Sequence, residues 1–469
     1  MGFAKVMARR RPPLWQRELN YLSLVLFHIG IGAFIYFLPP FRKPFYLAVI
    51  VFFFYKIITT VKSKKLFWVL SACAYIVAGE SLFRMTGGGL FYEISKYLVI
   101  LFCLFGMFYD GISGRGYPYF IYLIALVPAV VLASINLSYD LRFRSSVAFV
   151  LSGPVSLGIA ALYCYNKKMS TSDMLDLLKI MSMPIISMTT YLFLYTPSVK
   201  EVVTGTASNY ATSGGFGPNQ VTTILGLGVF AFTVRLFLRS PSLSLKLVNG
   251  FLLAAIAYRG IVTFSRGGIL AALITIAAFL VVLYWQSGPR RKQQIIGSFV
   301  LLLLVAVGTW LYSKSQTNDL IENRYTGKDA LGREKEDVTT GRVELFLEEF
   351  EGFEENPFFG VGASGMKNER LEEKGRIIAS HNEISRLLSE HGMLGVFILC
   401  ILLFKPLSLR KPSNKNIFFY AFLAFWFATI NHSAMRLAAP GFIYALALIY
   451  VTNDKKRPVR RQLPQRAAA

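Results

Sequence analysis

Two short segments of this 469-residue chain carry residue types suited to acid–base and anion chemistry. The first is Ser380-His381-Asn382-Glu383, near the end of a long polar interval. Ser380 followed by Glu383 is the capping-box pattern, which predicts a helix beginning here with His381 in its first turn. Unpaired backbone N–H groups and the positive end of the helix dipole disfavour a cation there. We therefore expect a neutral imidazole that can accept a proton, beside a helix end that attracts phosphate or diphosphate.

The second segment is a short turn between two apolar stretches, flanked by Arg259 and Arg266. An arginine at the membrane is costly, so it usually meets an anion or lines a wet cavity, and its fork matches phosphate oxygens. Gly267 and Gly268 allow a ligand or another helix to approach the backbone closely. Arg342, which opens a later helical segment, is a further candidate anion contact. The alternatives are that Arg266 extends to the interface or pairs with an acid, and that Arg342 only begins a helix.

The four histidines also have structural interpretations. His381 alone fits a surface residue of a capped helix, and His391, before Gly392, fits a helix end. His28 and His432 lie in or beside apolar segments and are expected to be satisfied packing residues. Without a cluster of cysteine or acidic side chains, neither a metal site nor a cofactor is predicted.

These residues must be positioned by apolar segments, which recur along almost the whole chain. Of the residues in the chain, 54% are hydrophobic and 15% are aromatic. Most of the apolar segments are about 16 to 22 residues long, the length that crosses a bilayer as a helix. The sequence therefore predicts an all-α polytopic membrane protein with about 12–14 transmembrane helices. The expected spans are 20–39, 44–60, 66–83, 97–110, 117–137, 146–165, 174–196, 219–238, 247–264, 267–285, 294–313, 392–409, 416–432 and 437–452.

The net charge of +24 lies mostly in short loops between these spans, as cytoplasmic loops require, and not in a basic stripe that would bind nucleic acid. With the N-terminus inside, about 27 of the basic residues fall on that side, against about nine in the short loops opposite. Both termini are therefore predicted to be cytoplasmic. No cleavable signal peptide is expected. The inside group includes Arg9–Arg11, Lys62, Lys64, Lys65, Lys167, Lys168, Arg235, Arg239, Lys246, Arg290–Lys292, Lys405, Arg410, Lys411, Lys415, Lys455–Arg457, Arg460 and Arg461.

Two longer intervals then face outward, 197–218 and 314–391. Within the second, 342–355 carries apolar residues at helical spacing and predicts an amphipathic helix lying on the membrane surface or packed on the bundle. Asn356-Pro357 should end this helix, and Gly360-Val361-Gly362 should form a tight turn before the helix that begins at Ser380. We divide the chain into 1–313, an N-terminal transmembrane bundle; 314–391, a large outer loop with the catalytic segment; and 392–469, C-terminal transmembrane helices with a basic tail.

Other polar or reactive side chains in the apolar segments have two interpretations. The charged ones could line a proton or ion pathway. The interpretation favoured here is that they extend to the membrane surface or form buried pairs. They are Lys56, Glu80, Asp176 and Lys179. The four cysteines are expected to be small buried hydrophobes: Cys73, Cys103, Cys164 and Cys400.

The order of several motifs resembles the O-antigen ligase and polymerase superfamily over residues 200–410. These motifs are Gly217-Pro218-Asn219-Gln220, Ser265-Arg266-Gly267-Gly268, Thr340-Gly341-Arg342, residues 356–362, Ser380-His381-Asn382-Glu383 and residues 390–395. The resemblance implies a fold like the C-type membrane glycosyltransferases and a metal-independent transferase in the bacterial inner membrane. Its donor would be an undecaprenyl-diphosphate-linked glycan, with lipid A–core or another glycan as acceptor at the periplasmic face.

The resemblance also implies residue roles. Arg266 would bind the donor diphosphate and His381 would assist the acceptor hydroxyl, with Arg259 and Arg342 as further diphosphate contacts. Asn382 and Glu383 would orient the imidazole or the sugar, and inversion at the anomeric carbon is expected. A ligase is favoured over a polymerase that uses a lipid-linked repeat as acceptor or a member that glycosylates proteins. A lipid-linked sugar transporter is the rival class, but the paired inverted repeats it predicts are not found in the sequence.

Overall fold

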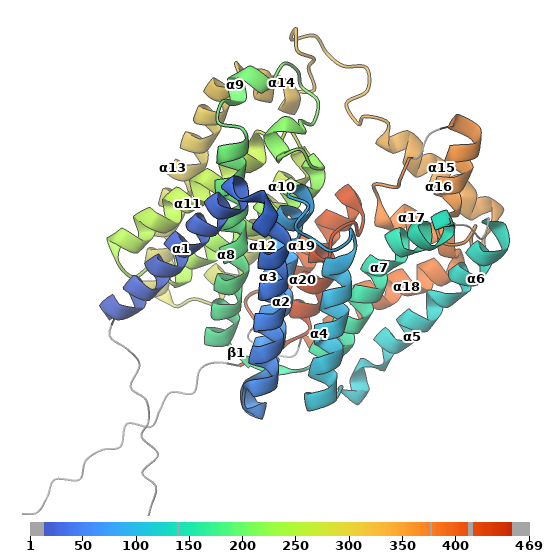
Figure 1. The fold of residues 1–469 in the computed structure, drawn as a ribbon, viewed down its shortest axis with the longest axis horizontal. Coiled ribbons are helices and arrows are strands. Elements are labelled where there is room, and N and C mark those ends of the chain that lie inside the picture. The colour runs from blue at the N-terminus through green and yellow to red at the C-terminus, as the bar shows by residue number, and fades with distance from the viewer. Residues whose placement is uncertain (1–13, 138–140, 376–377, 411–415, 453–469) are drawn as a thin grey trace, which may run out of the picture.

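The computed structural model describes residues 14–137, 141–375, 378–410 and 416–452, and these residues are almost entirely helical (Figure 1). Nine of the described helical segments are long and apolar enough to cross a membrane. The prediction of a helical, polytopic membrane protein is therefore confirmed. A parallel pair of short strands, β1 (Lys168–Ser170) and β2 (Tyr450–Thr452), departs from an all-α fold.

Each predicted span contains at least one helix. The helices at these positions are α1 (Leu14–Phe37), α2 (Arg42–Thr59), α3 (Lys62–Met85), α4 (Ile94–Asp110), α5 (Tyr117–Ala125), α6 (Val127–Asn136), α7 (Leu141–Cys164), α8 (Thr171–Tyr195), α10 (Pro218–Leu238), α11 (Leu243–Ile261), α12 (Arg266–Trp285), α13 (Pro289–Gln316), α18 (Met393–Phe404), α19 (Phe419–Ser433) and α20 (Ala439–Ala447).

Two predicted spans differ from single helices. Residues 117–137 form α5 and α6, because Pro128 lacks an N–H group and clashes with the carbonyl group four residues earlier. Residues 437–452 form α20, of nine residues, followed by β2, which pairs with the strand that precedes α8. The segment 434–438 between α19 and α20 is not helical.

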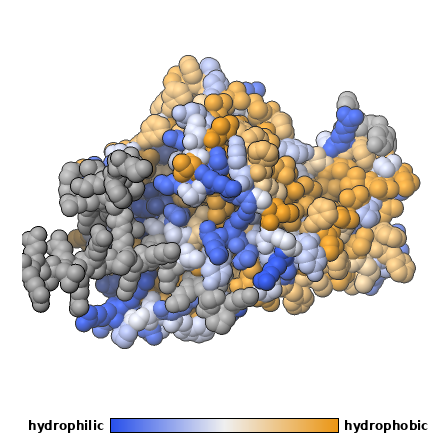
Figure 2. Space-filling model, turned by 90° about the horizontal axis from the view of Figure 1, so that it is seen from below, coloured by the Kyte–Doolittle hydropathy of each residue, from blue (hydrophilic) through white to orange (hydrophobic). Residues whose placement is uncertain are grey.

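The loops gather at two ends of the bundle (Figure 1). The β1–β2 pair marks one end, and Figure 2 shows hydrophilic residues collected across the middle of that face. At the opposite end, residues 197–217 contact residues 262–338: Asn209 N donates to Thr263 O, and Lys335 Nζ to Thr206 Oγ1. Of the basic residues predicted to be cytoplasmic, Arg9–Arg11, Lys411, Lys415, Lys455–Arg457, Arg460 and Arg461 lie outside the described residues.

The long interval 314–391 folds into short helices: α14 (Leu320–Tyr325), α15 (Arg342–Glu355), α16 (Gly365–Lys374) and α17 (Glu383–His391). The predicted amphipathic helix is confirmed as α15, and its apolar side chains Val343, Phe346, Leu347 and Phe350 are exposed, not packed on the bundle. The tight turn is also confirmed, since Gly360 and Gly362 have φ of 73° and 90°. The strongly charged sequence of α16 carries no apolar period, so sequence analysis did not predict this helix.

The polar residues of the apolar segments are largely paired. Asp176 and Lys179 form an ion pair of 3.3 Å, and Lys56 lies over the rings of Phe52 and Trp68. Three cysteines are buried as predicted, whereas Cys400 is exposed.

Candidate active site

The N-terminus of α12 meets the C-terminus of α19 at the end of the bundle that carries the long interval. These two helices pack along their length, and the absent side chain of Gly267 leaves room for the imidazole of His432. Arg266 begins α12, and its guanidinium group donates to the carbonyl oxygens of Arg324 (3.4 Å) and Val338 (2.8 Å). The predicted role of glycine here, a close approach between helices, is confirmed.

Three arginines converge on a cavity of about 470 Å³ at this point, which we call the arginine cavity. Arg324, which lies on α14 and is buried, donates from Nε to Phe264 O at 3.1 Å. Arg342 begins α15, and its side chain makes no hydrogen bond to another described residue. The lining residues are Ser208, Asn219, Ser265, Arg266, Gly267, Arg324, Val338, Thr339, Thr340, Arg342, Val343, Phe346 and Asn382.

The charge of this cavity is uncompensated. Within the described ranges, no carboxylate forms an ion pair with Arg266, Arg324 or Arg342. Burial lowers the pKa of Arg324 and Arg342, and the neighbouring Arg266 lowers both further. Arginines placed together against their mutual repulsion, around a cavity, suit a ligand with several negative charges.

The predicted capping box at Ser380 and Glu383 is wrong. Helix α17 begins at Glu383, and its N-cap is Asn382, whose Oδ1 accepts from the N–H groups of Ile384 (2.8 Å) and Ser385 (3.4 Å). Ser380 instead donates to Glu349 Oε2, a buried carboxylate of α15. An asparagine at the N-cap satisfies the same donors as a serine, so the start moves by two residues and His381 precedes the helix.

The predicted neutral state of His381 is supported, but for a different reason. Burial lowers the pKa of this half-buried imidazole to about 3, and the charges of Arg436 and Arg342 lower it further. Its Nδ1 atom is buried without a hydrogen-bond partner among the described residues. Desolvation and nearby arginines, not the helix dipole, therefore keep the ring neutral.

Residues 434–436, in the segment between α19 and α20, make hydrogen bonds to the segment that contains His381. Ala434 N donates to His381 O at 3.1 Å, and Met435 N donates to Glu383 Oε2 at 3.3 Å. The Arg436 guanidinium group donates to Ala379 O (3.1 Å) and Ser380 O (2.7 Å). These contacts fix the backbone on both sides of the imidazole.

A buried charge network within the bundle supports this junction. Arg84 pairs with Glu80 at 2.6 Å and donates to Arg436 O at 3.0 Å, while Glu80 Oε2 accepts from Ala438 N at 2.8 Å. Glu93 continues the network at 3.6 Å from Arg84. Glu80 therefore belongs to a buried pair, the alternative favoured from sequence, and the network anchors residues 436–438.

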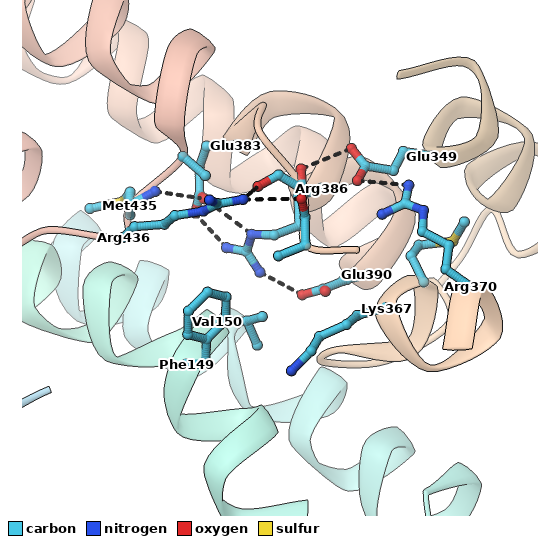
Figure 3. A pocket seen from close by; sticks show the side chains of 14 residues that line it. Phe149, Val150, Glu349, Lys367, Arg370, Glu383, Arg386, Glu390, Met435 and Arg436 are labelled. Carbon is cyan, nitrogen blue, oxygen red and sulfur yellow. Dashed lines mark hydrogen bonds and ion pairs between the residues drawn. The ribbon is translucent and has the colours of Figure 1, made fainter. Parts of the chain in front are cut away.

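A second, much smaller pocket of about 20 Å³ lies between α7, α15, α16 and α17 (Figure 3). Most of its charged side chains are paired with one another: Arg386 lies between Glu383 and Glu390, and Arg370 contacts Glu349 at 3.1 Å. Lys367 and Arg436 also line the pocket but have no ion pair among the described residues. Glu383 is thus placed in this pocket and not in the arginine cavity, which Asn382 lines. The role predicted for Glu383 in binding substrate stays a prediction.

Arg259 lies apart from the arginine cavity. Its fully buried guanidinium group donates to Thr196 O (3.2 Å), just before the loop 197–217, and to Thr212 O (3.0 Å), within that loop. The structure thus gives Arg259 a role in holding this loop, and its predicted contact with diphosphate stays a prediction.

Sequence analysis missed Arg324, Arg436 and His432. His432 was expected to be a satisfied packing residue, but both its ring nitrogens lack hydrogen-bond partners in the described part of the chain. An arginine in the gap between two apolar segments was the available signal for Arg436. Arg324 carried no such signal, because it is one of several basic residues in a polar interval.

A comparison with protein families finds that residues 250–400 match the model of the O-antigen ligase family. The resemblance drawn from the sequence motifs is therefore confirmed over this segment, which contains Arg266, Arg324, Arg342 and His381. The family comprises membrane glycan transferases, and the match does not separate ligases from polymerases. Comparisons with curated proteins and with solved structures give no match.

Proposed function

We propose that this protein is a glycosyltransferase that moves a glycan from undecaprenyl diphosphate to lipid A–core at the periplasmic face of the inner membrane. The observation that carries the proposal is the convergence of Arg266, Arg324 and Arg342 on one cavity without carboxylate partners. A diphosphate brings the negative charges that such a site lacks. The match to the O-antigen ligase family supports the same donor class.

In the proposed reaction the acceptor hydroxyl oxygen attacks the anomeric carbon as the bond from that carbon to the diphosphate oxygen breaks. The arginines neutralise the charge that develops on undecaprenyl diphosphate, so that leaving requires no metal ion. Direct displacement inverts the anomeric centre. It needs no covalent intermediate.

His381 is the proposed acceptor of the hydroxyl proton. Its neutral Nδ1 has no partner in the described structure, so a lone pair is available. A pKa of about 3 makes the ring a weak base. A bound diphosphate would offset the charge of Arg342, which removes one of the smaller causes of the low pKa of His381 and makes the ring a stronger base, while burial remains the largest cause.

The experiment supplies purified protein in detergent with an undecaprenyl-diphosphate glycan, EDTA and one of two acceptors, lipid A–core or a second lipid-linked repeat. Wild type is compared with His381→Ala, Arg266→Ala and, as a matched control, Arg333→Ala, an exposed arginine that pairs with Asp329. We expect product on lipid A–core from wild type and the control, and at least a hundredfold loss in the two site variants.

A ladder on the lipid-linked acceptor would make the protein a polymerase with the same chemistry. Full activity of His381→Ala would overturn the role of the histidine for either acceptor. Binding of the donor without transfer to either acceptor would favour a transporter.

A further inference from the structure

A second large cavity lies at the end of the bundle opposite the arginine cavity. It has a volume of about 870 Å³ and is enclosed by α1, α8, α10, α11 and α13. Apolar side chains such as Leu24 and Leu245 form part of its wall. The basic residues that line it are Lys179, Arg235, Arg239 and Lys246, and the acidic ones are Glu18 and Asp176.

Arg235 is the most buried of the basic residues that line this cavity. It is only 5% exposed, and its guanidinium carbon lies 3.8 Å from the centre of the Tyr21 ring. Its Nε atom has no hydrogen-bond partner, and no carboxylate of the described chain forms an ion pair with it. Burying an arginine without a counter-charge is costly, and more so within a membrane protein. Such a residue at a cavity wall suits an anionic ligand.

The other basic residues are arranged around the same space. Arg239 donates to Ser172 Oγ at 2.9 Å and to Ser172 O at 3.3 Å, which fixes its guanidinium group at the wall. Lys179 is paired with Asp176, but Lys246 has no ion pair in the described ranges. The cavity therefore keeps positive charge in excess after its internal pairing.

We propose that this cavity binds the phosphate-bearing headgroup of an anionic membrane phospholipid. The cavity lies at the ends of membrane-spanning helices, at the same end of the bundle as β1, where lipid headgroups lie. Basic pockets between helices bind anionic headgroups at this depth, and the apolar part of the wall suits the first carbons of acyl chains. This site is separate from the arginine cavity, so it does not depend on the proposed transferase activity.

Glu18 distinguishes this proposal from a purely structural role of Arg235. The Glu18 Oε1 atom is buried without a hydrogen-bond partner, although Glu18 lines the same cavity. If Arg235 serves to compensate Glu18, neutralising the acid removes a stabilising partner. If Arg235 binds a lipid phosphate, neutralising the acid removes a repulsion and tightens lipid binding.

The experiment measures lipid binding to delipidated protein in detergent by native mass spectrometry, and lipid-induced shifts of the thermal midpoint. The probes are phosphatidylglycerol, phosphatidylcholine and inorganic phosphate at matched ionic strength. We expect phosphatidylglycerol to raise the thermal midpoint of wild type selectively. Phosphatidylglycerol should bind about tenfold more weakly to Arg235→Gln and also more weakly to Arg239→Gln. It should bind more tightly to Glu18→Gln. Arg290→Gln, an exposed basic residue at the start of α13, is the control and should bind as wild type does.

Equal shifts with phosphatidylglycerol and phosphatidylcholine would overturn the proposal. So would wild-type lipid affinity in both Arg239→Gln and Arg235→Gln. If Arg235→Gln does not fold, Arg239→Gln and Glu18→Gln still test the site. Competition by millimolar inorganic phosphate, with an equal thermal shift, would assign the cavity to a free phosphate and overturn the lipid assignment.

Discussion

Gly267 and His432 are in such close contact that a Cβ atom on Gly267 would lie 2.0 Å from His432 Nδ1. Gly267 follows Arg266 at the start of α12, and His432 precedes the segment that holds His381 in place. The absence of a side chain at Gly267 thus allows the helix end that carries Arg266 to pack against the helix that leads into the segment holding His381.

Substituting Gly267→Ala should therefore separate these two parts. We expect a lower thermal midpoint and at least a tenfold loss of transfer, because His432 or the start of α12 must move. Gly308→Ala in α13, where an added Cβ meets nothing within 4 Å, is the matched control. It should retain the wild-type thermal midpoint and the wild-type transfer activity. Equal behaviour of the two variants in differential scanning fluorimetry would contradict the close contact.

Arg342→Gln tests donor binding with little structural cost. Since the Arg342 side chain makes no hydrogen bond within the described structure, the variant should keep the wild-type thermal midpoint. We expect its KM for the lipid-linked donor to rise at least tenfold, because a charge-assisted contact to diphosphate is lost. Titration with a diphosphate analogue measures this directly. An unchanged affinity would exclude Arg342 from the site.

His391 provides a test of pH dependence. Burial, followed by the charge of Arg386, lowers its pKa to about 3 in the folded protein, from about 6.5 in the unfolded chain. A group with a depressed folded pKa binds its proton first in the unfolded state, so its stabilising effect is full above pH 6.5 and is lost as the pH falls toward 3. We expect the thermal midpoint of wild type to fall from pH 7 to pH 5, with His391 and His381, both with a pKa lowered to about 3, contributing in the same direction.

The variant His391→Leu isolates that contribution. Both ring nitrogens of His391 are buried without partners in the described chain, so an apolar side chain of similar size should be neutral or stabilising at pH 7. It should also flatten the fall below pH 6.5. Burial raises the pKa of the adjacent Glu390 to about 7, but Glu390 is present in both proteins, so their difference reports on His391. Parallel pH curves would exclude His391 as the cause.

The buried network of Glu80 and Arg84 predicts strong non-additivity. Arg84→Gln leaves Glu80 buried without its cation and should lower the thermal midpoint severely, by the equivalent of about 3–5 kcal/mol. Adding Glu80→Gln removes the orphaned charge, while its amide oxygen can still accept from Ala438 N, and should recover part of the loss. A double-mutant cycle of thermal midpoints measures this coupling. Simple addition of the two single effects would show that the pair does not act as a unit.

The same cycle run on activity tests whether the network positions the site. Because Arg84 donates to Arg436 O, the double variant should remain folded but show reduced kcat. A double variant with wild-type kcat would restrict the network to a role in stability.

The sequence alone determined the class of the protein, the approximate positions of its apolar helices and several residues of the candidate site. Apolar segments of membrane-spanning length can only be satisfied as helices, so their positions followed from composition. The apolar period of 342–355, its proline stop and the glycines at 360 and 362 are local signals, and α15 and its turn were predicted with correct boundaries. Arg266, Arg342 and Asn382 were also selected from sequence and lie at one cavity.

Only the tertiary structure decided which charges are paired. Arg259 and Arg266 look alike in sequence, yet the first is bound to the carbonyl oxygens of Thr196 and Thr212 and the second faces a cavity. Arg324 and Arg436 join the site through contacts between segments distant in sequence, which no local pattern encodes. The same holds for the low pKa of His381, because desolvation and neighbouring arginines are properties of the packed molecule and not of the capping sequence.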